Sequence, residues 1–538
     1  MSEELNEENV PETAEPVEAE TPVADAAPAA DGTVAETPHK GFFGKVDKWF
    51  GITKSGSNYK TEIVAGLTTF MAMVYILMVN PGMFSAIPGL SFGGMYIATA
   101  LGAIVGTMLM AFLAKMPLAQ ASGMGVNAFV VFSLVLGSAG LTYANAMVFT
   151  LLDGVIFIIL TVTGLRKHIF KAIPDEVRKA INVGLGLFIA FIGLQNAGAI
   201  VNNDSTLVSL VSFNVLATNF ATYSGGTVGG ILPALVALLG VTAIAILSKH
   251  KVKGAILWGI LGSTVLYYIM AGFGCLVGGA TLDDGTLTNG LACKEIFNSI
   301  GRQFSFNPFD AFVSWGKESA GKVFYEGFNF SHYLGGEGHN VGSLVLLLLT
   351  TALSLCMLDM FDTIGTLYGA CEKGGLLDKN GNPLNMNRCM LSDAIATTVG
   401  AIAGTSTVTT FVESSAGVAA GGKTGFTALI TGLCFIVAMF LSPIAQLVPS
   451  AATATALIWV GVLMMSSVIN IKWTDPAEAL PAFLTIAVMS FGYEISYGIG
   501  IGMIASLIVK ICTGKIKQIS VVTWIITIFF LATFAFTH

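Results

Sequence analysis

The chain has 538 residues, of which 54% are hydrophobic and only 11% are charged. Repeated apolar runs of about 20 residues in such a chain exclude an ordinary soluble domain. They predict an all-α polytopic membrane protein, with membrane lipid as its surroundings. The net charge of −7 says little about partners, because eleven of the 33 acids lie in one N-terminal segment and the rest of the chain is mildly positive. We expect no nucleic-acid partner.

That segment, residues 1–38, holds eleven Asp and Glu and no Lys or Arg, with Pro and Ala between them. Such a composition cannot build a core, so we predict a disordered acidic cytoplasmic tail. It has neither the basic nor the apolar region of a signal peptide. In residues 39–60, Phe42, Val46 and Trp49 fall on one helical face, which predicts an amphipathic interfacial segment. A disordered linker is the alternative there.

Fourteen apolar segments follow, in two sets of seven. The first set is 62–80, 94–114, 119–137, 143–165, 177–201, 227–248 and 254–274, and the second is 343–370, 390–403, 407–420, 425–447, 452–470, 478–491 and 495–511. With the N-terminus inside, 22 of the 26 Lys and Arg fall on cytoplasmic stretches. The other four lie in an extracytoplasmic insertion, 273–342, which is too long for the positive-inside rule to count. The charges therefore predict a cytoplasmic-membrane protein with a cytoplasmic N-terminus.

Two seven-segment halves in one chain must run in opposite senses. Residues 61–272 and 343–511 are therefore expected to form an inverted repeat, the plan of many secondary transporters. The C-terminal apolar segment, 512–538, either lies in the interface or crosses the membrane once more.

The third segment of each half is interrupted. In the first half, Pro117, Gly123 and Gly125 predict that no helix begins before about Asn127. In the second half, the Thr-rich text of residues 404–417 predicts an extended piece that leads into a short helix. Irregular backbone at this depth is tolerated only where it is buried or lines a cavity. Two half-helix N-termini would there offer free N–H groups and positive dipole ends to a ligand.

Two aspartates lie in the middle of an apolar segment, although a charge at bilayer depth costs at least ~2.5–3.5 kcal/mol. Asp359 and Asp362 are three residues apart on one helical face. Glu413 opens the half-helix of the tenth segment, and Asn127 is its counterpart in the third. Carboxylate acceptors, an amide and backbone N–H groups suit a flat, polar, nearly neutral ligand such as a nucleobase. An inorganic anion would require Lys or Arg, or bare helix ends.

Burial favours the neutral form of a carboxyl, so one of the three could hold a coupling proton while another binds the ligand. Alternatives remain for each residue. Asp359 or Asp362 could be a protonated structural carboxyl, and Glu413 or Asn127 could cap its helix. Asp153 also lies at bilayer depth, where we expect an interhelical hydrogen bond. The secondary candidates are Thr366, Ser414 and Asp153.

The seven cysteines form no C-x-x-C pair, so we expect no metal site and no cofactor other than a coupling ion. Cys275 and Cys293 both fall in the exterior insertion or at its border. We hypothesise a disulfide between them. The six histidines lie outside the expected site, which argues against a histidine proton carrier.

Four stretches together resemble the AzgA-like purine permeases of the nucleobase/ascorbate transporter superfamily. They are "TEIVAGLTTFMAMVYILMVNP" (61–81), "SGMGVNAFV" (122–130), "DMFDTIGTL" (359–367) and "GTSTVTTFVESSAG" (404–417). The resemblance implies a core domain from segments 1–4 and 8–11 and a gate domain from segments 5–7 and 12–14. It also implies proton-coupled import of adenine, guanine or hypoxanthine by an elevator-type movement, usually in a homodimer.

The resemblance implies five binding residues, which are Asn127, Gly125, Asp359, Asp362 and Glu413. It does not divide substrate and proton roles among the three carboxylates. The small residues of segment 452–470 are expected to form a sliding surface, so that Phe at Ala454 or Gly461 slows transport without abolishing binding. Three other readings stay open: an anion carrier of the same overall fold, an intramembrane aspartyl protease, and a channel. The protease reading is weakened because its two aspartates must face each other from different helices.

Overall fold

The structure is a computed structural model. It describes residues 41–137, 140–165, 173–213, 219–224, 227–303, 306–335, 340–379, 381–516 and 519–536. The predicted acidic tail, 1–38, lies outside these residues. The chain forms two units, Met1–Asp47 and Lys48–His538. The first unit contributes the start of helix α1 (Phe42–Phe50), which agrees with the helix predicted within 39–60.

The second unit is mostly helical, as predicted. Among the described residues, ten helical stretches are long and apolar enough to cross a membrane. They contain α2 (Tyr59–Met73) with α3 (Ile76–Phe84), α4 (Phe92–Leu109) with η2 (Met110–Ala114), α6 (Tyr143–Thr163), α8 (Asp175–Asn196), α9 (Ile231–Lys249), α10 (Ala255–Gly274), α15 (Val341–Lys373), α18 (Gly425–Ala438) with η4 (Met439–Leu441) and α19 (Ser442–Ala445), α20 (Ser450–Met465) with η5 (Ser466–Asn470), and α22 (Ile495–Cys512). The other helices of this region are α5 (Met124–Ala128) with η3 (Phe129–Val135), α16 (Met386–Ala403), α17 (Ser414–Ala419), α21 (Pro476–Phe491) and α23 (Val521–Phe536).

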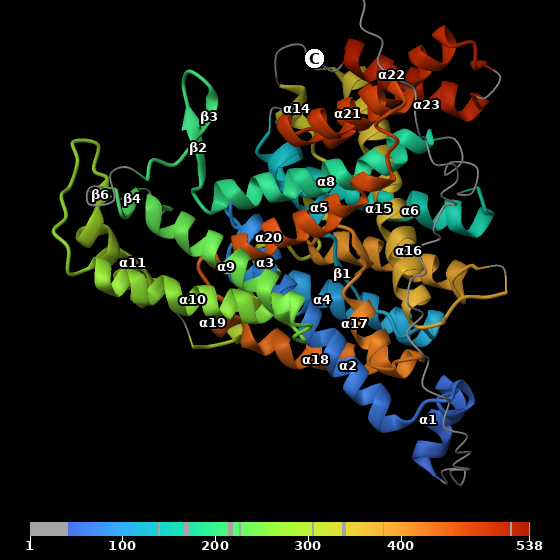
Figure 1. The fold of residues 1–538 in the computed structure, drawn as a ribbon, viewed down its shortest axis with the longest axis horizontal. Coiled ribbons are helices and arrows are strands. Elements are labelled where there is room, and N and C mark those ends of the chain that lie inside the picture. The colour runs from blue at the N-terminus through green and yellow to red at the C-terminus, as the bar shows by residue number, and fades with distance from the viewer. Residues whose placement is uncertain are drawn as a thin grey trace, which may run out of the picture. The chain divides into compact units, whose positions relative to one another are not determined.

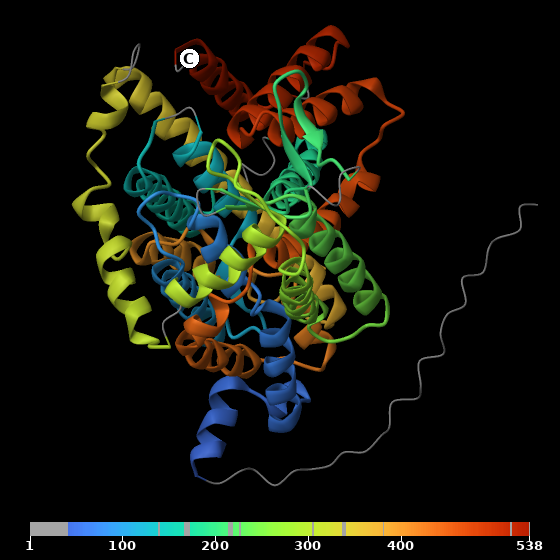
Figure 2. The same ribbon diagram turned by 90° about the vertical axis from the view of Figure 1, so that its left-hand side faces the viewer.

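The connections between the long helices carry small strands and helices. The strands are β2 (Ile200–Asn203), β3 (Leu207–Leu210), β4 (Thr222–Ser224), β5 (Thr227–Gly229) and β6 (Leu287–Thr288), and the helices of the insertion are α11 (Asn289–Gln303), α12 (Phe309–Glu318), α13 (Lys322–Tyr325) and α14 (Ser331–Leu334). The β2–β3 hairpin stands out from the helices in both Figure 1 and Figure 2.

The insertion is tied to the ends of two membrane helices. The Glu318 carboxylate accepts hydrogen bonds from the backbone N–H of Ser91 at 2.7 Å and from its hydroxyl at 2.6 Å. Trp315 donates its indole N–H to the backbone oxygen of Ala403 at 2.8 Å. Because Ser91 caps α4 and Ala403 ends α16, α12 holds these two helices together. Cys275 and Cys293 are free thiols, so the structure does not contain the predicted disulfide.

The two predicted interruptions meet each other. Strand β1 (Gln120–Ser122) precedes α5, strand β7 (Val408–Thr410) precedes α17, and the strands pair antiparallel with Ala121 opposite Thr409. We call this pair the ribbon; β1 is fully buried and contacts α3 and α4 in the interior of the helical unit (Figure 1). One prediction is wrong by about a turn, because α5 begins at Met124 rather than near Asn127. Gly123 is extended, but Gly125 takes ordinary helical geometry and does not delay the helix.

The Gly-rich loop before α18 binds a carboxylate from the chain itself. Glu62 of α2 accepts hydrogen bonds from the backbone N–H of Lys423 at 3.0 Å and from the hydroxyls of Thr424 at 2.9 Å and Thr427 at 2.6 Å. A negative charge is stabilised at a helix N-terminus. Glu62 therefore fixes α2 to α18.

The small residues of α20 serve close packing against α8. A Cβ on Gly461 would lie 2.5 Å from the backbone oxygen of Gly186, and Ala454 packs in a cluster with Ala197 and Ala237. At these two positions α20 faces α8 and α9, and the expected sliding surface stays a prediction. Phenylalanine there would separate α8 from α20, since cores tolerate little added volume.

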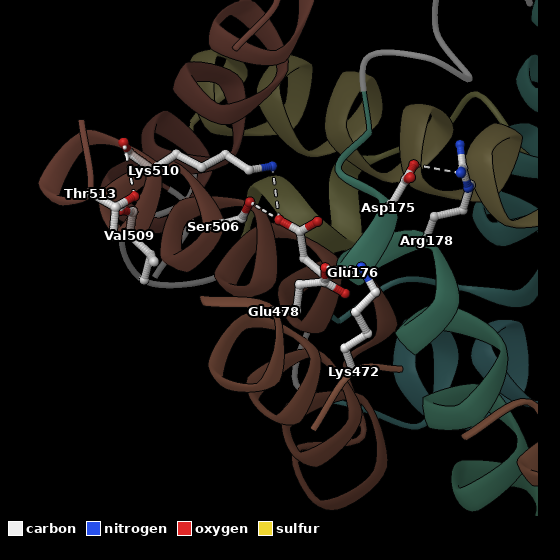
Figure 3. Close-up of polar contacts among 9 residues, drawn as sticks. All are labelled: Asp175, Glu176, Arg178, Lys472, Glu478, Ser506, Val509, Lys510 and Thr513. Atoms are coloured by element: carbon white, nitrogen blue, oxygen red, sulfur yellow. Dashed lines mark hydrogen bonds and ion pairs between the residues drawn. The ribbon is translucent and has the colours of Figure 1, made fainter. Parts of the chain in front are cut away.

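At one end of these helices an ion pair joins α8 to α22. The Glu176 carboxylate lies 2.9 Å from the Lys510 ammonium and accepts a hydrogen bond from the Ser506 hydroxyl at 2.6 Å (Figure 3). The side chain of Glu176 is 7% exposed, whereas Asp175, which pairs with Arg178, is 68% exposed. The first pair is shielded, so removal of one partner would leave a buried charge without its counter-ion, whereas the exposed second pair contributes little.

Candidate functional site

The polar side chains around the ribbon form two sets, one on each of its faces. Side chains of successive strand residues point to opposite faces. Thr409 donates its hydroxyl to Oδ2 of Asp362 at 3.4 Å, whereas the next residue, Thr410, donates to Oδ1 of Asp393 at 3.2 Å. The two faces of the ribbon therefore contact different carboxylates.

The first set consists of Tyr75, Asp362, Thr409 and Glu413, which we call the ribbon cluster. The Tyr75 hydroxyl, at the junction of α2 and α3, donates to Oε1 of Glu413 at 2.5 Å. Asp362 and Glu413 interact electrostatically, and both side chains are half-buried. Two carboxyls that keep partial access, beside a phenol and a hydroxyl, can exchange hydrogen bonds with a polar ligand.

Glu413 does not cap its helix. It occupies the N-cap position of α17, but its side chain makes no capping hydrogen bond. The first N–H groups of α17, those of Ser414, Ser415 and Ala416, bond to the backbone oxygens of Phe411, Val412 and Glu413. The prediction of free N–H donors at this half-helix is therefore wrong, because a tight turn in front of α17 occupies them. The ligand-binding capacity lies in side chains instead.

Asn127 lies in a separate polar network. Its Oδ1 accepts hydrogen bonds from the hydroxyls of Ser122, at 2.9 Å, and Ser406. The Ser122 hydroxyl is also 2.8 Å from that of Thr405, to which Asn80 donates. Within the described part of the chain, the Nδ2 of Asn127 is buried and has no hydrogen-bond partner, so one amide N–H₂ remains as a donor. Asn127 is near the end of α5, and the capping alternative is wrong for it.

Gly125 serves packing. A Cβ at this position would lie 2.5 to 2.7 Å from the side-chain atoms of Leu185 on α8. The absence of a side chain lets α8 approach α5 directly.

The second set consists of Asp153, Asp359 and Asp393, which we call the buried carboxyl cluster. All three side chains have no exposed surface. Asp393 accepts hydrogen bonds from Nε2 of Gln120 at 2.5 Å, from Thr410, and from Thr363. Asp359 accepts one, from the Thr397 hydroxyl at 3.3 Å. The three carboxyls lie close enough to interact electrostatically.

The prediction of an interhelical hydrogen bond from Asp153 is wrong. Neither of its carboxyl oxygens has a hydrogen-bond partner, so the expected interhelical hydrogen bond is absent from the described structure. The adjacent Gly154 brings α6 so near α16 that a Cβ there would lie 2.5 Å from the Thr398 hydroxyl. Close helix packing encloses the carboxyl without supplying it a donor.

The hydroxyls of the secondary candidates Thr366 and Ser414 hydrogen-bond to backbone groups of the protein. Thr366 donates its hydroxyl to backbone oxygens of its own helix, those of Asp362 and Thr363, both at 3.0 Å. The Ser414 hydroxyl accepts from the Ala119 N–H at 2.9 Å and so pins β1 to α17. Sequence reasoning missed Tyr75 and Asp393. The available signal was an aspartate inside the text "LSDAIATTVGAIAG" of segment nine.

These features define a membrane protein whose buried polar site is built where two broken helices pair, as in carriers that handle a polar solute. The model of a family described as "Permease family" matches residues 60–501. The chain belongs to this family. Its relatives are permeases, so the protein is a transporter rather than an enzyme.

Two relatives illustrate the family. The guanine/hypoxanthine permease PbuO of Bacillus subtilis is 37% identical over 484 residues, which cover 89% of this chain and 98% of the relative. The adenine permease AdeP of Escherichia coli is 32% identical over 493 residues, which cover 92% of this chain and 96% of the relative. The resemblance to purine permeases seen in the sequence is thereby confirmed at the level of the family.

Solved structures share the fold. The transmembrane domain of the cyanobacterial bicarbonate transporter BicA superposes with a TM-score of 0.52 at 15% identity, over 82% of this chain and 97% of that one. SLC26A9 superposes with a TM-score of 0.54 at 12% identity, over 88% of this chain and 69% of that one. At such identities the likeness concerns architecture alone.

Proposed function

We propose that the protein is a secondary active transporter that imports purine nucleobases, namely hypoxanthine, guanine or adenine, across the cytoplasmic membrane with protons. The observation that carries the proposal is the ribbon cluster, in which Asp362 and Glu413 face each other beside Tyr75 at the junction of the two broken helices. A purine carries N–H donors and ring-nitrogen acceptors. Carboxylates that accept and hydroxyls that donate match both. The relatives PbuO, a guanine/hypoxanthine permease, and AdeP, an adenine permease, support the same substrate class.

The proposal includes an arrangement of the membrane segments. Fourteen segments would form two inverted repeats, with segments 1–4 and 8–11 as the core domain and segments 5–7 and 12–14 as the gate. The core would carry the base past the gate in an elevator-type movement. The N-terminus would be cytoplasmic, and two copies would assemble as a homodimer in the lipid. Among the proton-coupling candidates Asp359, Asp362 and Glu413, the ribbon cluster supplies two and the buried carboxyl cluster one.

The test is uptake of radiolabelled hypoxanthine, adenine, guanine, xanthine and uracil into cells that lack their own carriers, with and without a proton uncoupler. Glu413→Gln removes the acceptor charge that binds Tyr75. Hydrogen bonds to charged groups contribute about 1.5–3 kcal/mol, so uptake should fall at least about tenfold. The control is Glu326→Gln, because Glu326 is an exposed residue that pairs with Lys322 at the surface. Purine uptake that persists in Glu413→Gln, or that ignores the uncoupler, contradicts the proposal.

A second candidate is an anion carrier, which the shared fold with a bicarbonate transporter favours. In the described residues, no Lys or Arg forms an ion pair with Asp359, Asp362 or Glu413, and the site is acidic. An anion would be repelled there. Uptake of labelled bicarbonate or sulfate, in place of all five bases, would favour this candidate.

A further inference from the structure

The mechanism proposed above leaves Asp153 without a role, and its surroundings are unusual. Both of its carboxyl oxygens and Oδ1 of Asp359 are buried with no hydrogen-bond partner among the described residues. These two side chains come from α6 and α15, and Asp393 of α16 completes the cluster. A buried polar atom without a partner costs about 1–3 kcal/mol, and a charged one costs more. Something that the protein side chains do not supply must satisfy these oxygens.

A proton fits this site better than a metal ion does. The described residues contain no group of three His, Cys, Asp or Glu arranged to hold a metal. The titratable groups that face Asp153 are Asp359 and Cys356 of α15 and Asp393 of α16, and none of them forms an ion pair in the described structure. Asp362, the next carboxyl along α15, interacts electrostatically with Asp359 and Asp393. Asp393 is satisfied as an anion by its three donors. Neighbouring buried carboxyls disfavour one another's charged forms, and Asp393 already has the donors that an anion needs, so Asp153 and Asp359 are the members of the cluster suited to hold a proton.

One hydroxyl links this cluster to the ribbon. Thr397 donates to Asp359, and its oxygen accepts the backbone N–H of Val408 at 3.2 Å. Val408 belongs to β7, in which the next residue, Thr409, binds Asp362. A change of charge at Asp153 acts electrostatically on Asp359, and two hydrogen bonds connect Asp359 through Thr397 to the strand that borders the ribbon cluster.

We propose that Asp153 is a proton-holding residue of the transport cycle. On loading, a carboxylate oxygen of Asp153 forms an O–H bond with a proton from the exterior side. On release, that bond breaks and the proton leaves to the interior, while Asp359 stays neutral. Asp153 touches no substrate and acts on the ribbon through Asp359 and Thr397. This inference rests on the proposed proton symport and adds to it a carrier outside the ribbon cluster.

The full chain reconstituted in vesicles tests the proposal with two assays. One is exchange of labelled for unlabelled purine without any gradient, and the other is purine accumulation driven by an imposed gradient of one pH unit. One coupled proton supports about tenfold accumulation under that gradient. Asp153→Asn is neutral in every state, so it should retain exchange within about twofold and lose the gradient-driven accumulation. Asp153→Glu should retain both. The control is Thr150→Val, one turn away on α6, where the hydroxyl bonds only to its own helix.

Accumulation by Asp153→Asn equal to that of the wild type would overturn the proposal, because a residue that stays protonated throughout is replaced by Asn without effect. Wild-type protein that exchanges purine but ignores the pH gradient would instead refute the proton symport. If Asp153→Asn fails to fold, infrared spectra of the wild type and of Asp153→Glu, recorded as a function of pH, test the proposal instead. A neutral-carboxyl band that disappears at high pH and shifts with the Glu variant supports the proposal. A band unaffected by pH refutes it.

Discussion

Asp359 and Asp362 are one helical turn apart on α15, yet they belong to different regions of the molecule. Asp362 is half-buried, with a hydroxyl from β7 and a second carboxyl, Glu413, as its neighbours. Asp359 has no exposed surface and faces Asp153 and Asp393. A three-residue spacing places two side chains on one side of a helix. In the folded chain, however, Asp362 contacts the β7 strand of the ribbon, whereas Asp359 contacts the buried carboxyl cluster.

The difference shows how access limits the chemistry of a carboxyl. In the ribbon cluster the carboxyls of Asp362 and Glu413 keep partial exposure, which a bound molecule could contact. The buried carboxyl cluster, on α6, α15 and α16, has no exposed side-chain surface. Substrate binding is therefore expected from the first cluster, and structural or proton-holding roles from the second.

The largest effect is expected for Asp393→Ala. The substitution removes the acceptor of the Thr363 and Thr410 hydroxyls and one of the two acceptors of the Gln120 amide N–H₂. Each buried unsatisfied group costs about 1–3 kcal/mol, so the free energy of unfolding should fall by more than about 3 kcal/mol. Thermal unfolding of the purified protein in detergent measures the loss. Asp283→Ala, at an exposed position, should leave the unfolding temperature unchanged. Equal stability of Asp393→Ala and wild type would show that the buried carboxyl cluster is not a structural centre.

An intermediate effect is expected for Tyr75→Phe. This substitution keeps the buried ring and removes the hydroxyl that donates to Glu413. Loss of one hydrogen bond to a carboxylate should lower the apparent affinity for purine about tenfold. The KM of uptake measures the change.

Tyr96→Phe is the matched control, because that buried hydroxyl donates to the backbone oxygen of Ala438, outside both clusters. Its KM should stay within about twofold of the wild type, since surface and remote substitutions have small effects. Equal KM values for Tyr75→Phe and Tyr96→Phe would remove Tyr75 from the site.

The sequence predicted the features that depend on local chemistry. Pro117 and Gly123 predict the first helix break, and the Thr-rich run before Glu413 predicts the second. Proline and glycine disfavour a helix, and β-branched threonine favours extended backbone, wherever they occur in a chain. The intramembrane position of Asp359 and Asp362 was equally visible, since a charge stands out in an apolar run.

The partners of these residues could not be predicted in the same way. Tyr75 and Glu413 are 338 residues apart in sequence, and Gln120 and Asp393 are 273 apart. Local patterns carry no information about such pairs. Asp393 was overlooked because an aspartate three residues into a segment is read as a helix end near water. Its burial follows from the docking of α16 against α4 and α6, which only the folded chain shows.

The smallest effect is expected for Thr366→Val, although the sequence placed this residue on the face of the two aspartates. Its hydroxyl bonds to carbonyls of its own helix, which remain bonded within the helix when the hydroxyl is removed. The free energy of unfolding should change by less than about 0.5 kcal/mol, and purine uptake should stay within about twofold of the wild type. Thr363→Val, one position after Asp362, is the contrast, because that hydroxyl donates to Asp393 and its loss leaves a buried acceptor short of one bond. A large loss of uptake in Thr366→Val with normal stability would mean that its hydroxyl turns toward the substrate during transport. The division between the two clusters would then have to be redrawn along α15.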